Sequence, residues 1–162
     1  MELLRLVLLA VVVLALLMVA RHDLRHFTIP NRAIATLCVL ACAVLALPGA
    51  PDGTQAILAA VILTAIGVVA WAMGAMGAGD AKMGAPLGLL VGTGGLVPFA
   101  ALLGMACVAL LVAIALLGDG RQGRGWRAAL GRMARERRVP FALPMVAAAL
   151  PVIAVIHGTA HP

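Results

Sequence analysis

The sequence has few charges, no tyrosine and little other aromatic content. Charged residues make up 11% of its 162 residues, and aromatic residues make up 3%. A soluble domain carries roughly 25% charged residues, so this scarcity excludes an ordinary soluble fold. Tyrosine and tryptophan usually mark the two membrane interfaces, and such aromatic belts are almost absent from this chain. The three cysteines form no CxxC pair, which excludes a zinc-ribbon module.

What the sequence does contain is apolar. Hydrophobic residues account for 64% of the chain and come in long unbroken runs. Runs without polar alternation exclude a membrane β-barrel and predict membrane-spanning helices. The 18 glycines suit helices that approach each other closely through small residues. We therefore expect an all-α integral membrane protein with a single transmembrane domain over residues 1–162.

The lengths of the apolar runs predict a polytopic bundle of about six transmembrane helices. The first run is interpreted as a retained helix, not as a signal peptide, because the basic residues Arg21 and Arg25 follow it. The stretch Met83–Leu117 is too long for one crossing of roughly 20 residues. A turn at Gly92–Gly95 is expected to split it and to leave a short fourth helix. The expected spans are Leu3–Ala20, Asn31–Leu47, Gln55–Met76, Met83–Val91, Val97–Leu117 and Pro140–His157.

The distribution of basic residues supports this count. With six crossings and the N-terminus outside, one side of the membrane holds every lysine and arginine except Arg5. Cytoplasmic loops are enriched in these residues, so that side is predicted to be cytoplasmic. If Met83–Leu117 crossed only once, the arginine-rich segment Arg121–Arg138 would face the other way. The net charge of +6 is thus explained without nucleic-acid binding.

Two aspartates stand at the edges of apolar runs. Asp80 lies in the segment Gly77–Lys82 between two such runs, and Asp23 follows the first run. Ionisable residues near hydrocarbon are costly and are candidates for function. Two carboxyl groups held close together share a proton. One can then act as a base on water while the other donates to a carbonyl oxygen. The topology places both aspartates on the cytoplasmic side, as acid/base chemistry would require.

A purely structural interpretation competes with this chemistry. Asp23 could pair with one of the arginines at positions 21, 25 and 32, and Asp80 could pair with Lys82. Both interpretations remain open from the residues alone.

Two further features have alternative interpretations. His22 and His26 have the i, i+4 spacing that could ligate a metal on a helix, but they also fit an interfacial pair that adds positive charge. No HExxH signature is present, and we expect neither a metal nor a cofactor. In the segment Gly118–Arg138, apolar residues at helical spacing among arginines predict an interfacial helix on anionic headgroups. An ordinary solvated basic loop is the alternative.

Three elements together resemble a known family. The Gly-x-Gly-Asp-x-Lys pattern of Gly77–Lys82 is similar to the GxGD motif of intramembrane aspartic proteases, most closely the type IV prepilin peptidases. In that family an earlier aspartate precedes an Ile-Pro-Asn element, as Asp23 precedes Ile29–Asn31 here. Val139–Phe141 resembles the Pro-aromatic element that opens the last helix. Ala142 replaces the glycine that often follows, and we expect this change to affect helix packing and not the aspartate pair.

The resemblance implies a function and assigns roles. Asp23 and Asp80 would be the catalytic pair, Gly77 and Gly79 would shape the turn that carries Asp80, and Lys82 would steady that loop or its charge. The implied activity is that of an aspartic endopeptidase, without a metal, cofactor or covalent intermediate. It would remove the basic leader from prepilin-like precursors. The implied location is the bacterial inner membrane, with several spans and an active site that faces the cytoplasm.

The small size of the chain resembles the minimal peptidases of tight-adherence (Flp) pilus systems, which have no methyltransferase segment. Expected partners are the precursor and membrane lipids, and not nucleic acid. The alternative function is non-enzymatic: a small transporter or pilus assembly subunit whose aspartates relay protons or pair helices. The oligomeric state, the pilin that is cut and the preassembly of the pair are not specified by the sequence.

Overall fold

The computed structural model describes residues 2–48, 50, 52–117 and 141–158, and every regular element in these ranges is helical. This confirms the predicted all-α class. The predicted interfacial helix in Gly118–Arg138 lies outside the described residues, as do Val139 and Pro140. The elements are α1 (Glu2–His26), α2 (Asn31–Leu45), α3 (Gly53–Ala72), α4 (Ala78–Val91), the 3-10 turn η1 (Thr93–Gly95), α5 (Leu96–Leu117) and α7 (Ala142–Gly158).

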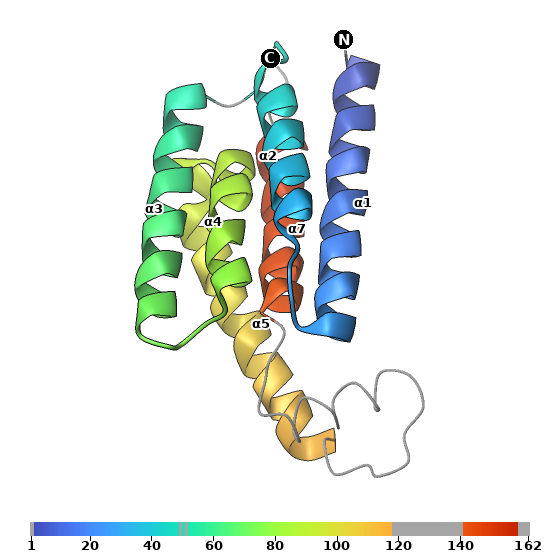
Figure 1. Cartoon of the computed structure of the whole chain (residues 1–162). Helices are drawn as coiled ribbons and strands as arrows, with labels where there is room; N and C mark the ends of the chain where they lie inside the picture. Colours follow the sequence, from blue (N-terminus) through green and yellow to red (C-terminus); the bar gives the residue numbers. More distant parts are fainter. Residues whose placement is uncertain (1, 49, 51, 118–140, 159–162) are drawn as a thin grey trace.

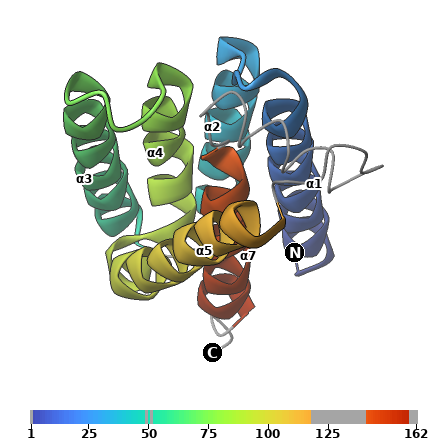
Figure 2. The same ribbon diagram turned by 90° about the horizontal axis from the view of Figure 1, so that it is seen from below.

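Five of the helices stand side by side, and the sixth slants away. In Figure 1, α1, α2, α3, α4 and α7 run along the bundle, and α5 extends past its lower end. Figure 2 shows the same bundle from below, with α5 lying across it. The α1–α2 and α3–α4 connections both lie at the lower end in Figure 1, so they bring together the end of α1 and the start of α4.

Among the described residues, three helices have the length and apolar character of membrane spans. Leu3–His26, Gly53–Ala72 and Thr93–Leu116 are long and apolar enough to cross a bilayer, while α2 and α7 are apolar but shorter. Large apolar side chains such as Leu3 and Val61 are exposed on the outside, where lipid would cover them. The protein is a polytopic helical membrane protein, as predicted. The full count of six crossings and the outside N-terminus stay predictions.

The first helix is longer than the apolar run that predicts it. It continues past Ala20 to His26, so Asp23 lies in its last turn and not after it. The polar residues between Arg21 and His26 include no glycine or proline that would stop a helix. The helix therefore ends only where the chain turns toward Pro30, the residue that precedes α2.

The long apolar stretch is split where predicted, but the fourth helix begins earlier than expected. Gly92 has a φ of 62°, and this left-handed residue separates α4 from η1 and α5. The prediction that α4 starts at Met83 is wrong, because the helix begins at Ala78 and includes Asp80. In Figure 1, α4 nevertheless stops below the upper ends of α1 and α3, as expected for a short fourth helix.

Small residues let α3 and α4 pack backbone against backbone. A Cβ atom at Gly84 would lie 2.8 Å from the carbonyl carbon of Leu63, and one at Gly88 would meet the Ala60 backbone. A Cβ atom at Gly67 would lie 2.9 Å from the Cα atom of Ala81. Because real Cβ atoms do not approach so closely, these positions require glycine. The contact fixes α4, and with it Asp80, against α3.

Candidate active site

Asp23 is a buried carboxylate at the end of α1. Its side chain is only 3% exposed, and its Oδ2 atom accepts a hydrogen bond of 3.2 Å from the backbone N–H of Ala142 in α7. The C-terminal end of a helix disfavours negative charge, so α1 itself gives no structural reason for an acidic residue there. Within the part of the chain that the structure describes, no arginine is paired with Asp23. The structural alternative, an ion pair between Asp23 and a nearby arginine, is therefore not formed among the described residues.

Asp80 lies in the first turn of α4, ahead of the apolar segment that begins at Met83. Its carboxylate accepts a hydrogen bond from the Gly77 N–H, which is half of the capping-box arrangement of a helix start. The second oxygen, Oδ1, is buried and has no hydrogen-bond partner in the described ranges. The pairing with Lys82 that served as the structural alternative is not formed. Instead, Lys82 Nζ donates to Asn31 Oδ1 at 3.0 Å.

The two aspartates, which come from helices far apart in the sequence, line one cavity. Its volume is about 350 Å³, and it opens beside the α1–α2 connection and the start of α4. Burial, and next the nearby charge of Asp23, raise the pKa of Asp80 to about 6, although the Gly77 hydrogen bond opposes this shift. The remaining lining includes Phe27, Thr28, Ile29, Asn31, Gly77, Gly79 and Lys82. All five residues that the sequence proposes for the site therefore lie around one cavity.

Gly77 and Gly79 serve the site by having no side chain. The resemblance implied that they shape the turn that carries Asp80, but Gly77 has a φ of −73° and Gly79 is helical, so neither needs the conformational freedom of glycine. A Cβ atom at Gly77 would lie 2.9 Å from Asp80 Oδ2. A Cβ atom at Gly79 would lie 3.2 Å from the Cβ atom of Ile29. The first glycine thus leaves room for the carboxylate, and the second lets α4 approach the α1–α2 connection.

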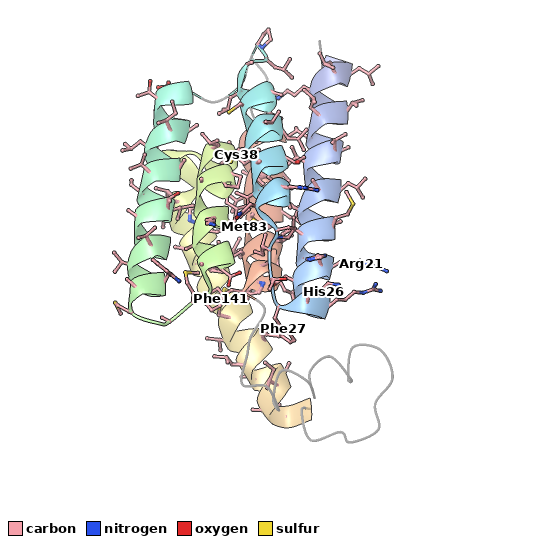
Figure 3. All side chains as sticks on the ribbon, in the orientation of Figure 1. Arg21, His26, Phe27, Cys38, Met83 and Phe141 are labelled. Carbon is pink, nitrogen blue, oxygen red and sulfur yellow. The ribbon has the colours of Figure 1, made fainter. Side chains whose placement is uncertain are left out.

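Phe27 has a strained backbone beside the cavity. Its φ of 52° is in the left-handed region, which a bulky aromatic residue rarely adopts and which costs on the order of 1–3 kcal/mol. Its N–H donates to the Asp23 carbonyl oxygen at 2.8 Å and closes the last turn of α1. Figure 3 shows Phe27 and Phe141 at the same lower end of the bundle. Nothing in the sequence signals this conformation.

Two contributions to the site were not predicted. The backbone N–H of Ala142 binds Asp23, whereas the prediction for this position concerned only the replacement of glycine by alanine, which leaves that N–H in place. A backbone donor is present at almost every residue, so no sequence pattern could identify it. Asn31 belongs to the recognised Ile-Pro-Asn element, but its role as the partner of Lys82 appears only in the structure.

The two histidines near Asp23 contact each other. The rings of His22 and His26 have centroids 4.5 Å apart and are tilted by 37°. Both side chains are exposed. Across the described ranges, no three His, Cys, Asp or Glu side chains gather as possible metal ligands. The interfacial interpretation of the pair stays a prediction.

Fold and site together define a polytopic helical membrane protein in which two aspartates from different helices line one cavity. Residues 10–117 match the family model described as the type IV leader peptidase family, and the chain belongs to that family. The matched region contains both Asp23 and Asp80. The protein is thus a protease of the leader-peptidase type. Neither the curated proteins nor the solved structures include a match to this chain.

Proposed function

We propose that the protein is an aspartic endopeptidase that removes the basic leader from prepilin-like precursors at the cytoplasmic face of the bacterial inner membrane. One observation carries the proposal: Asp23 and Asp80 line the same cavity. In the described residues, neither carboxylate is neutralised by a lysine or arginine. Both groups are therefore available for acid/base chemistry.

The chemistry follows from one proton shared by the pair. The ionised carboxyl takes a proton from a water molecule as the water oxygen attacks the scissile carbonyl carbon. The protonated carboxyl donates to the carbonyl oxygen and gives a tetrahedral diol. Return of a proton to the amide nitrogen breaks the C–N bond and releases the leader. The proton belongs to the pair, so we assign neither role to one aspartate alone.

The position of the cavity suits a substrate that leaves the membrane at this point. It lies where α1 ends and α4 begins, at the edge of two apolar helices. We propose that the hydrophobic helix of the precursor docks between spans while its basic leader stays in the cytoplasm. The scissile bond would then reach the aspartates at the membrane surface.

Leader removal from a co-expressed precursor tests the proposal. Asp23→Asn and Asp80→Asn are each expected to abolish the shift of the precursor on a gel. Asp52→Asn is the matched control, because Asp52 caps α3 through the Thr54 N–H and lies outside the cavity. Membrane insertion and the gel-filtration profile establish that each variant is folded. Chelator is expected to leave cleavage unchanged.

Processing that survives either substitution in the cavity would overturn the aspartic mechanism. If the wild-type protein leaves every precursor uncut while still supporting pilus assembly, a transport or assembly role would replace the peptidase role. The two results are distinguishable. In the first, the precursor is cut without one of the two aspartates, and in the second it is not cut at all.

A further inference from the structure

A second cavity lies at the opposite end of the bundle, between α1 and α7. Its volume is about 260 Å³. One continuous helix separates it from the candidate active site, since Arg5 and Asp23 are about 27 Å apart along α1 at 1.5 Å per residue. The lining combines the polar Arg5 and His157 with apolar side chains, among them Leu6, Leu9, Val13 and Ile153. The aspartate chemistry uses none of these residues.

Arg5 is a buried cation that has no partner among the described residues. Its side chain is 7% exposed, and its Nε and one terminal nitrogen, Nη2, are buried and make no hydrogen bond in the described part of the chain. A guanidinium group stays protonated at any physiological pH. Burying such a charge without a counter-ion costs several kcal/mol, so a stable protein normally supplies or recruits one. A bound anion would satisfy this charge.

His157 provides a second buried polar atom without a hydrogen-bond partner in the same cavity, as far as the described residues show. It is 3% exposed, and its Nε2 lies 2.9 Å from the carbonyl oxygen of Leu90. A carbonyl only accepts, so Nε2 carries the hydrogen, and Nδ1 is left buried without a partner. In the neutral ring Nδ1 is an acceptor. A ligand with an anionic group for Arg5 and a neighbouring hydroxyl or amine for His157 would satisfy both.

The apolar walls point to a lipid. A cavity between two apolar helices that is lined mostly by leucine, valine, isoleucine and alanine suits an acyl chain. Arg5 is the fourth residue of α1, so it lies near one end of a helix long enough to span a bilayer, where lipid phosphate groups would be. Arginine binds phosphate oxygens through two parallel N–H bonds. We propose that this cavity binds one anionic phospholipid, with its phosphate on Arg5 and its headgroup beside His157.

Lipid binding by the purified full-length protein tests this site without any protease assay. Native mass spectrometry in detergent would count bound phosphatidylglycerol, and phosphatidylcholine and inorganic phosphate serve as separate comparisons. We expect one tightly held phosphatidylglycerol per chain. Arg5→Met is expected to weaken its binding by about tenfold, since a charge-assisted pair is lost. Arg25→Met removes the same charge from an exposed position on the same helix and should leave this molecule bound.

A second variant covers the case in which Arg5→Met does not fold. Ala10→Phe keeps Arg5 but fills the apolar part of the cavity, so it should also release the lipid. Equal retention of phosphatidylglycerol by wild type and by the folded variants would overturn the proposal. So would inorganic phosphate that competes as well as the lipid, because the site would then serve a soluble anion.

Discussion

The backbone N–H of Ala142 donates a hydrogen bond to Asp23 Oδ2 at 3.2 Å, in a buried contact between the first residue of α7 and the last turn of α1. A carboxylate at the end of a helix has several rotamers, and this bond selects one. The last helix thereby orients one member of the aspartate pair. Residue 142 lies outside the region that the family model matches, which is 10–117.

Removing this N–H should reduce activity. Proline lacks the N–H and is tolerated at the first position of a helix, although its ring also crowds the carboxylate. We expect Ala142→Pro to slow leader cleavage by about 10- to 100-fold, because a hydrogen bond to a charged group contributes about 1.5–3 kcal/mol. Ala142→Gly keeps the donor and should stay within about threefold of wild type. Equal losses in both variants would mean that packing matters and the bond does not.

Gly77→Ala should impair the site more than it impairs the fold. The added Cβ atom would lie 2.9 Å from Asp80 Oδ2, the end of a side chain that can rotate away. We therefore expect about a tenfold or larger loss of cleavage, with a change in the free energy of unfolding below about 1 kcal/mol. Gly94→Ala is the control, since nothing lies within 4 Å of its Cβ position. Unchanged cleavage by Gly77→Ala would contradict the proposed need for space at this carboxylate.

The hydrogen bond between Lys82 and Asn31 should act as a positioning contact. It joins Lys82, the fifth residue of α4, to Asn31, the first residue of α2, at 3.0 Å on the exposed rim of the cavity. We expect Lys82→Met to reduce cleavage severalfold while changing stability by less than about 1 kcal/mol. Asn31→Ala should have the same effect, and the double variant should be no worse than either single one. Fully additive losses would show that the two side chains act independently.

The pKa of Asp80 gives the site a pH dependence of known sign. Its value of about 6 lies above the ordinary 3.8, so protonation favours the folded state. That stabilising contribution is complete below about pH 4 and is lost as the pH rises through about 6. Cleavage should also fall above about pH 6, because the pair then loses its shared proton. A rate that keeps rising toward pH 8 would contradict this expectation.

An NMR titration of labelled aspartate in the full-length protein measures this pKa directly. The Asp23→Asn substitution should lower the pKa of Asp80, because the charge of Asp23 is one of the two effects that raise this pKa. The pKa of Asp80 should still lie above the ordinary 3.8, because its carboxyl group remains buried. An unchanged pKa in the variant would mean that the two carboxyl groups do not interact.

Length, hydropathy and charge predict the helices, and the resemblance of Gly77–Lys82 to the GxGD motif, with Asp23 ahead of the Ile-Pro-Asn element, supplies the five site residues that line the cavity. The split near Gly92 follows from the limit that bilayer thickness sets on one span. The start of α4 could not be predicted in the same way. Gly77 and Gly79 suggest a turn by local propensity, but α4 already begins at Ala78, where it packs closely against Ile29 and α3. The strained φ of Phe27 likewise depends on tertiary contacts and not on local sequence.

The glycine-mediated contact between α3 and α4 has a consequence for how the protein enters the membrane. With 14 residues and an internal proline, Pro86, α4 is too short to be held in the bilayer by its own hydrophobicity. Its partner α3 has 20 residues and meets the length of a full span. The two helices should therefore enter the bilayer together as one hairpin, and Asp80 reaches its final depth through the insertion of α3.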